Sequence, residues 1–405
     1  MSSFAFLQKT SAHTQIAREE AETGVFRRGS VCAIIAPHFS LSMVMTAATV
    51  VQEPRIDASA PSPTSLSSAS PPSTALAPAP LSRRFSIAPM MAWTTRDFRY
   101  LARLLTHRTL LYTEMVVAQA VIHGNRDELL GFDPQEHPLV VQLGGNDPRA
   151  LAEATRICAD YGYDEVNLNI GCPSDRVQKG KIGAVLMAEP DQVARCVEAM
   201  SAATTIPVTV KTRIGIDQHD DYAFLHRFVR HMHDAGCRSL TIHARKAILA
   251  GLSPKENRDI PPLVYQRAYA VKEDFPDMEI ILNGGLRDIP SMLEHLGQVD
   301  GLMVGREAYG NPYFLAGVDH AVFGDSRPAP DRRQVAEAFI PYLQRRYAQG
   351  VHPKHVLRHV LNLFLAVPGA RAYRRHLSEY AHRPDATPEV FEQALAKLDA
   401  APLSS

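Results

Sequence analysis

The sequence predicts an α/β fold: a TIM (β/α)8 barrel followed by a small all-helical C-terminal domain. From Phe85 onward, short apolar runs alternate with helical patterns, and many of these runs are rich in Val, Ile and Leu. Such runs are typical of parallel strands that are covered on both faces. Eight strand–helix units occupy about 240 residues, the usual size of a TIM barrel. A doubly wound sheet is the alternative, but Pro89-Met90-Met91 stands where its GxGxxG fingerprint would follow the first strand.

The expected strands are the short apolar runs, at 85–90, 110–115, 138–143, 165–170, 207–212, 239–244, 279–283 and 301–304. The expected barrel helices have amphipathic patterns, at 97–106, 148–161, 190–203, 222–235, 263–274, 289–297 and 312–322. Pro148 and Pro190 stand at first-turn positions, where proline suits a helix start. Three further helices are expected in the C-terminal segment, at 341–347, 355–365 and 370–380.

The chain of 405 residues is expected to have three parts: a disordered low-complexity extension at 1–81, a catalytic barrel at 82–326 and a helical domain at 327–400. Residues 58–80 are rich in Ala, Ser and Pro, so they cannot bury a core. Residues 31–51 are moderately apolar but hold too many polar groups for a membrane span. We therefore expect no membrane partner.

Charge and cysteine content narrow the functional classes. The 43 basic residues balance 43 acidic ones, but ten basic residues and only two acidic ones lie between 327 and 375. This imbalance predicts a basic helical module that binds an anionic partner. The five cysteines are odd in number and form no CxxC pair, which argues against a disulfide framework and a structural zinc site. We expect no metal, a reducing cytoplasmic location and a monomer.

Chemically active side chains follow almost every expected strand. A barrel keeps its catalytic groups at the carboxyl ends of its strands, so these residues should share one mouth. They are Pro89, Met90 and Met91, Glu114, Gln142, Asn169 with Cys172, Lys211 with Arg213, His243 with Arg245, Asn283 with Gly284 and Gly285, and Gly305 with Arg306.

Each of these residues also has a purely structural interpretation. Cys172 could be a small buried residue at a strand end, and Lys211 a solvated end charge. His243 could be a hydrogen-bonded core histidine, and Gly284-Gly285 only a tight turn. One shared ligand explains the set better than independent structural coincidences at every strand end.

The last two strands indicate the kind of ligand. TIM barrels often bind phosphate in the loops after strands seven and eight, through backbone N–H groups. Asn283-Gly284-Gly285 and Gly305-Arg306 offer glycines for close approach and one fixed cation. Gln142 and Lys211 could address a ring system across the mouth. A planar cofactor with one phosphate is therefore expected, and flavin mononucleotide (FMN) is the simplest such molecule.

Long, ordered motifs in the chain resemble the tRNA-dihydrouridine synthases. They include Leu111 to Met115, Asn167 to Arg176, Val210 to Gly215 and Ile242 to Lys246. Gly251 to Arg258 and Pro368 to Arg371 resemble the A subfamily in particular. The resemblance begins near residue 84 and extends to the end of the basic module.

This resemblance implies an oxidoreductase that reduces the C5–C6 double bond of D-loop uridines in tRNA, at positions 20 and 20a. FMN would be the cofactor, NADPH the reductant and Cys172 the proton donor. The implied FMN contacts are Pro89, Met90, Met91, Gln142, Lys211, His243, Asn283, Gly284, Gly285, Gly305 and Arg306. The implied tRNA contacts are Asn169, Lys255, Arg258, Arg371 and Arg374.

The sequence departs from the family in the loop after the first strand. Ala92 and Thr95 occupy places where members usually carry acids, so contacts of this loop are expected to differ.

The implied chemistry is reasonable for a cysteine. Hydride transfer to uridine C6 leaves C5 in need of a proton, and an unperturbed thiol can donate one at neutral pH. Because a nearby cation would favour the thiolate, Cys172 is expected to lie away from Lys211. A nucleophilic cysteine paired with His243 is the alternative.

Two other functions fit part of the pattern. A small-molecule flavin oxidoreductase resembling dihydroorotate dehydrogenase would use the same barrel mouth but leaves the basic module unexplained. A non-catalytic tRNA-binding protein would explain the basic module but not Cys172, Lys211 and His243 at the strand ends.

Overall fold

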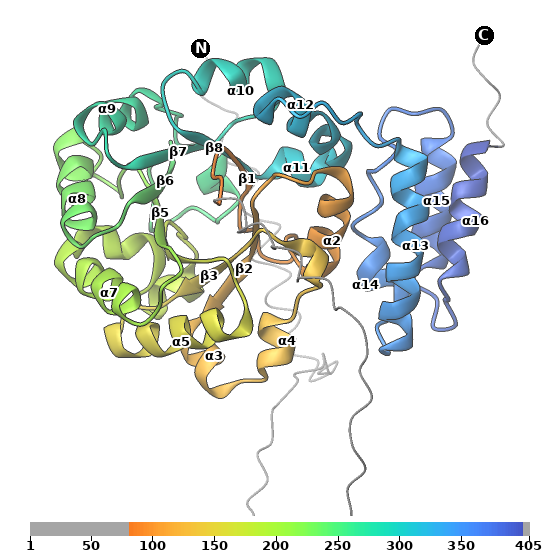
Figure 1. Ribbon diagram of the computed structural model, residues 1–405, viewed down its shortest axis with the longest axis horizontal. Coiled ribbons are helices and arrows are strands. Elements are labelled where there is room, and N and C mark those ends of the chain that lie inside the picture. The colour runs from red at the N-terminus through yellow and green to blue at the C-terminus, as the bar shows by residue number, and fades with distance from the viewer. Residues whose placement is uncertain (1–80, 400–405) are drawn as a thin grey trace, which may run out of the picture. The chain divides into compact units, whose positions relative to one another are not determined.

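The computed structural model describes residues 81–399, so the extension expected at 1–81 lies outside the described residues apart from Leu81. Eight parallel strands form one sheet in the order β1-β8-β7-β6-β5-β4-β3-β2, which confirms the predicted TIM barrel (Figure 1). The strands are β1 (Phe85–Ile87), β2 (Leu111–Val117), β3 (Leu139–Gly144), β4 (Glu165–Ile170), β5 (Val208–Arg213), β6 (Ser239–His243), β7 (Glu279–Asn283) and β8 (Gly301–Val304).

Short backbone contacts close the barrel between its first two strands. Ser86 pairs with Leu110 in an isolated parallel bridge. The Ile87 amide donates to the Leu110 carbonyl at 3.0 Å, and the Leu110 amide donates to the Phe85 carbonyl at the same distance. Because the sheet closes, no long strand edge is left open at this point.

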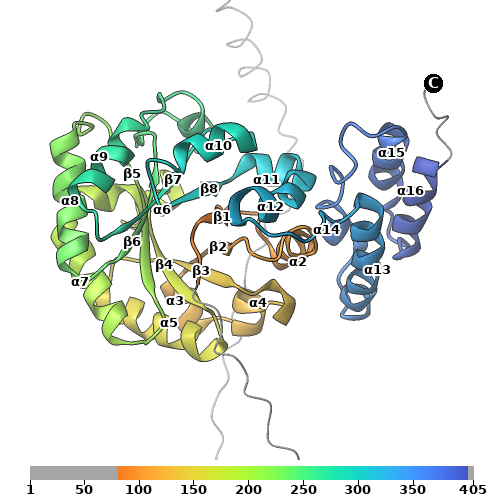
Figure 2. The ribbon, with the colours of Figure 1, turned by 45° about the horizontal axis from the view of Figure 1, so that its top comes forward.

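Helices surround the strands, as Figures 1 and 2 show. The α-helices of the barrel are α2 (Arg96–Leu105), α3 (Ala118–His123), α4 (Arg126–Leu130), α5 (Pro148–Tyr161), α6 (Asp175–Lys179), α7 (Pro190–Ala202), α8 (Tyr222–Asp234), α9 (Gln266–Asp274), α10 (Ile289–His295), α11 (Arg306–Gly310) and α12 (Val318–Phe323). Four 3-10 helices accompany them: η1 (Pro134–Glu136), η2 (Gly183–Ala188), η3 (Glu256–Arg258) and η4 (Pro312–Gly317).

Four more α-helices follow the barrel: α13 (Arg332–Ala348), α14 (Pro353–Leu357), α15 (Ala370–Tyr380) and α16 (Glu389–Asp399). The boundary expected between residues 326 and 327 lies in the segment that joins α12 to α13. No helix of residues 81–399 is long and apolar enough to cross a membrane.

The bounds of the helices show where the sequence pattern was sufficient. Helices α5 and α15 have the bounds that were predicted, and Pro148 starts α5 after the Asp147 side chain caps the Ala150 amide at 2.9 Å. The start predicted for α13 at residue 341 was wrong, because the helix begins at Arg332 and contains Pro341 internally. The helix predicted at 355–365 was also wrong in extent, since α14 ends at Leu357. Helix α16 was not predicted.

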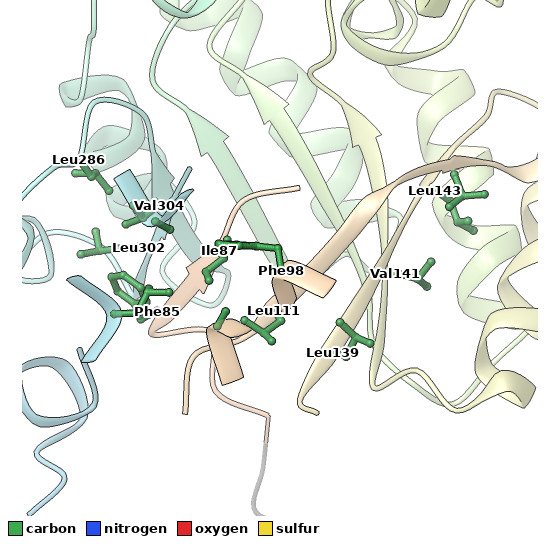
Figure 3. Packing of buried hydrophobic residues seen from close by; sticks show 14 of the residues in the cluster. Phe85, Ile87, Phe98, Leu111, Leu139, Val141, Leu143, Leu286, Leu302 and Val304 are labelled. Carbon is green, nitrogen blue, oxygen red and sulfur yellow. The ribbon is translucent and has the colours of Figure 1, made fainter. Parts of the chain in front are cut away.

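Strand residues alternate between two environments. Outward residues such as Val141 and Leu143 on β3 join the large core between sheet and helices, and Figure 3 shows part of this packing around Phe98. A smaller apolar cluster combines inward residues of β2, β3, β7 and β8 with the residue just after β1 and the residue just before β2. Its members are Ala88, Leu110, Tyr112, Val140, Ile281 and Met303. The inward positions of β4, β5 and β6 are instead polar throughout.

The barrel and the following helices meet at a buried carboxylate. Asp97 on α2 accepts hydrogen bonds from the Tyr342 hydroxyl at 2.7 Å and from the Arg346 guanidinium at 2.8 Å, both on α13. Tyr342 also stacks on Tyr100, with ring centroids 3.9 Å apart. Tyr342 and Arg346 of the basic module therefore pack against the barrel.

Candidate active site at the barrel mouth

The carboxyl ends of neighbouring strands bring the predicted groups together. The parallel register places Gln142 beside Asn167, Asn169 beside Lys211, Arg213 beside His243, and His243 beside Asn283. The predicted amides, cations and imidazole therefore form a continuous polar surface across β3 to β7.

The thiol of Cys172 lies on the loop just after β4, and the loop is held from its own strand. The Asn169 side-chain oxygen accepts from the backbone N–H groups of Gly171 at 3.1 Å and Cys172 at 2.9 Å. Cys172 is partly exposed, and its Sγ lies 3.6 Å from the Ser174 hydroxyl. The thiol is accessible while the backbone that carries it is fixed.

Two other residues hold the same loop. The Arg213 guanidinium donates to the Gly171 carbonyl at 2.8 Å and to the carbonyls of Lys246 and Asn257 at 3.0 and 3.1 Å. Gly183 has a φ of 77°, and a Cβ at this position would lie 2.5 Å from the Cys172 carbonyl oxygen. Only glycine permits this close packing.

Lys211 is a cation in a poorly solvated position. Its ammonium donates to the Asn283 side-chain oxygen at 3.0 Å, and Asn283 donates to the Met303 carbonyl at 2.7 Å. Burial, reinforced by the charge of Arg213 and opposed by Cys172, lowers the pKa of Lys211 to about 7. The charge of Cys172 therefore acts on Lys211, but no hydrogen bond in residues 81–399 joins the two side chains.

His243 at the end of β6 is uncharged at neutral pH. Burial, together with Arg213, Lys211 and other cations, holds its pKa well below the usual range. Within the described residues, no hydrogen bond joins His243 to Cys172. The Cys–His pair that the sequence left open is absent from this arrangement.

The glycines after β7 are required by the chain itself. Gly284 and Gly285 have φ values of 117° and 72°. Added Cβ atoms would lie 2.8 Å from His243 Cδ2 and 2.4 Å from Leu263 Cδ1, respectively. Their presence fits close approach of a ligand to the backbone, but the turn alone already explains glycine at both positions.

Arg306 follows Gly305 after β8 and already has an acidic partner. Its guanidinium donates to Asp259 at 2.6 Å and to the Arg258 carbonyl at 3.2 Å. This pair ties the β8 end to the loop after β6. A phosphate at this place would share Arg306 with Asp259.

The loop after β1 shows how the chain accommodates its unusual residues. Ala92 has a φ of 62°, its amide donates to Glu114 at 2.5 Å and its carbonyl accepts from Arg358 at 2.6 Å. The Thr95 hydroxyl is 2.9 Å from His359 Nε2. Both positions thus contact the segment that follows α14. Pro89 and Met90 are partly buried in this loop, whereas Met91 is 64% exposed.

The predicted tRNA contacts fall into different environments. Asn169 is buried and bonded within the site, Arg258 is half-buried and Lys255 is exposed. On α15, Arg371 is exposed and Arg374 is partly exposed. Among residues 81–399, neither arginine side chain of this pair has a hydrogen bond or ion pair to another group.

Four of the other eight cations of the basic module are paired with carboxylates. Arg327 pairs with Asp325, Arg333 with Glu337 and Asp399, Arg345 with Asp133, and Arg346 with Asp97. Net charge in this module therefore overstated the number of cations available to a partner.

Sequence reasoning missed the contribution of two residues that build the site, Asn167 and Gly183. It named Arg213 but missed that this residue holds the Cys172 loop. Asn167 was detectable, because Glu165-Val166-Asn167-Leu168-Asn169-Ile170 alternates polar and apolar residues with the period of a strand. No local signal marks Gly183 or the bonds of Arg213.

A closed parallel barrel with a fixed thiol, a desolvated amine and a neutral imidazole at the carboxyl ends of its strands defines a barrel enzyme. The model of the dihydrouridine synthase (Dus) family matches residues 86–399. The chain therefore belongs to the dihydrouridine synthase family.

Curated relatives match over most of their length. A Vibrio cholerae protein named tRNA-dihydrouridine(20/20a) synthase is 55% identical over 316 residues, covering 78% of this chain and 96% of that protein. Proteins of the same name from Yersinia pestis and Pseudomonas aeruginosa are each 53% identical, covering 78% and 80% of this chain and 91% and 97% of their own lengths.

Proposed function

We propose that this chain reduces the C5–C6 double bond of D-loop uridines in tRNA to 5,6-dihydrouridine, at positions 20 and 20a. The observation that carries the proposal is the polar mouth at the ends of β3 to β7, where one partly exposed thiol lies among a desolvated amine, a neutral imidazole and buried amides. The names of the curated relatives supply the substrate and the two positions.

The residues of the mouth fit FMN. Gln142 and Lys211 offer amide and ammonium donors to a ring system, and neutral His243 offers one further hydrogen bond. Asn283, Gly284, Gly285, Gly305 and Arg306 would bind the phosphate side, and Pro89, Met90 and Met91 would border the ring. When bound, FMN would supply the hydride that uridine C6 accepts, and NADPH would reduce the flavin beforehand.

Cys172 acts as the acid that gives C5 its proton. The bonds from Asn169 and Arg213 fix the backbone that carries the thiol, which restricts the direction from which the proton is delivered. Donation leaves a negative charge on sulfur, and Lys211, Arg213 and Arg258 lie within electrostatic range to stabilise it. The three cations near Cys172 therefore favour the thiolate that remains after proton transfer.

The tRNA must present an extruded base to the mouth, because the uridine edge is inaccessible inside the stack. Recognition then depends on shape and on phosphate contacts. Arg371 and Arg374 on α15 lack protein partners within the described residues and are suited to phosphates. Lys255 and Arg258, on the loop after β6, are placed to contact the RNA near the base.

Mass spectrometry of unmodified tRNA, incubated with the purified protein and NADPH, tests the proposal. We expect a gain of two hydrogens at uridine 20 and 20a, with none in the Cys172→Ala variant at equal protein concentration. Reduction of free orotate with tRNA left unchanged would reject the proposal in favour of a small-molecule oxidoreductase.

A further inference from the structure

A continuous line of hydrogen bonds runs through the barrel interior from its amino-terminal end to the thiol loop. It begins at Glu165, the first residue of β4, which is fully buried. The Thr209 hydroxyl on β5 donates to Glu165 Oε1 at 2.5 Å, and Asn167 Nδ2 donates to the Thr209 oxygen at 2.9 Å.

The line continues through amide side chains of two neighbouring strands. Gln142 Nε2 donates to Asn167 Oδ1 at 2.8 Å, and Asn169 Nδ2 donates to Gln142 Oε1 at 2.7 Å. Asn169 Oδ1 then accepts the amides of Gly171 and Cys172. Every hydrogen in the line points from the thiol loop toward Glu165.

Both ends fix this direction. At one end the backbone N–H groups of Gly171 and Cys172 can only donate. At the other, Glu165 accepts from the Arg83 guanidinium at 2.7 Å and from the Tyr112 hydroxyl at 3.3 Å. Burial raises the pKa of Glu165, and the Arg83 charge opposes that effect. An ionised carboxylate paired with arginine can only accept, so each amide between the ends has one allowed orientation.

We propose that Glu165, Thr209 and Asn167 are positioning residues that set the orientation of the Gln142 amide and the place of the Cys172 loop. None of them reaches the mouth itself. Hydrogen bonds in such a line polarise one another, so removing the Thr209 hydroxyl should weaken the bonds between Asn169 and the Gly171 and Cys172 amides. The inference rests on the proposed function for the roles of Gln142 and Cys172.

Thr209→Val breaks the line with almost no change of volume. Valine cannot accept from Asn167 or donate to Glu165, and Asn167 is left with an unsatisfied buried donor. Volume matters here, because a cavity of about 230 Å³ borders Thr209 and a smaller side chain could admit water in place of the hydroxyl.

Two variants give matched comparisons. Thr209→Ser restores the hydroxyl and should restore the line. Thr212→Val changes a buried threonine of the same strand whose hydroxyl has no hydrogen-bond partner among residues 81–399. It therefore controls for the loss of a buried hydroxyl outside the line.

The first measurement is amide hydrogen exchange of the peptide that contains Gly171 and Cys172. We expect roughly tenfold faster exchange in T209V than in wild type, with T209S and T212V within about twofold of wild type. The second is turnover on tRNA, where kcat should fall about tenfold in T209V while KM for tRNA stays unchanged, because Arg371 and Arg374, the proposed phosphate contacts, lie on α15 and outside the line.

Equal exchange and equal kcat in T209V and T212V would overturn the proposal, as would a T209S variant that is as impaired as T209V. If T209V does not fold, Thr209→Cys, with a similar volume and a weak hydrogen-bonding group, weakens the line without breaking it and should change exchange and kcat in the same direction by a smaller factor. Wild-type protein without dihydrouridine formation would reject the proposed function, whereas the exchange data would still decide whether the line holds the loop.

Discussion

The cations of the barrel mouth differ from those of the C-terminal helices in what surrounds them. At the mouth, burial is the first cause that lowers the pKa of Lys211, Arg213, Arg245 and Arg258, and neighbouring cations add to it. In the helices, hydrogen bonds to nearby partners raise the pKa of Arg333 and Arg345. Crowded, desolvated cations are typical of a functional site, and paired cations of a structural one.

Helix α15 shows a third situation. Arg371 is exposed and Arg374 partly exposed, and within residues 81–399 their side chains bond to no other group. The comparison therefore separates cations that serve chemistry, cations that hold the fold and cations available to a polyanion. The predictions below test this separation.

Loss of the thiol should have the largest effect. Cys172→Ala removes the proposed acid, and general acid catalysis contributes about 10²- to 10⁴-fold to rate. We expect dihydrouridine formation to fall by about that factor, while the yellow flavin and the affinity for tRNA remain. Cys158→Ala, at a fully buried cysteine of α5, is the control and should keep its turnover per folded molecule. Normal turnover in Cys172→Ala would remove cysteine as the acid.

The mouth should also respond to pH through Lys211. Its pKa is about 7 in the folded protein against 10.5 normally, so above pH 7 the unfolded chain binds more protons than the folded one. The stability of cofactor-free wild type relative to Lys211→Met should therefore rise between pH 7 and pH 9, by at most about 1.4 kcal/mol per pH unit. Below pH 7 the difference should be flat. Urea denaturation at several pH values measures it, and a difference independent of pH contradicts a desolvated amine.

The α15 arginines should affect binding and not chemistry. Arg371→Ala with Arg374→Ala should weaken tRNA binding roughly tenfold and reduce the slope of log affinity against log salt by about two. Arg327→Ala is the matched control, since this exposed arginine of the basic module pairs with Asp325. Filter binding measures the tRNA affinity of each protein at several salt concentrations. Equal slopes in wild type, the double variant and Arg327→Ala would reject the tRNA role of α15.

Backbone strain offers the smallest test. Ala92 near the mouth and Ala366 before α15 have φ values of 62° and 63°. Because glycine adopts this conformation without steric cost, Ala92→Gly and Ala366→Gly should each change the free energy of unfolding by less than about 1 kcal/mol. Thermal unfolding of both variants checks this, and strong destabilisation in Ala92→Gly alone would show that its methyl group packs against the loop.

The sequence was sufficient where a local pattern determines the structure. Apolar runs followed by Cys172, Lys211 or His243 located the strand ends, and parallel strands necessarily gather those ends. It was insufficient where the partner is distant in the chain. Arg345 and Arg346 form ion pairs with Asp133 and Asp97 of the barrel, so counting charges along the C-terminal segment could not show that these arginines are already paired.

The same limit applies within the site. Gly183 is required only because the Cys172 carbonyl packs against it, and Arg213 matters through its bond to Gly171. The helix expected to start at Pro341 begins instead at Arg332, and α13 continues through the proline.

The division between a catalytic mouth and a binding helix is tested most directly by single-turnover oxidation of pre-reduced, protein-bound flavin with saturating tRNA, followed by absorbance. The account predicts that Cys172→Ala is slowed about 100-fold or more at saturation, whereas the Arg371→Ala, Arg374→Ala double variant reaches the wild-type rate once tRNA is saturating. A double variant that stays slow at saturation, or a Cys172→Ala variant that reaches the wild-type rate, would contradict it.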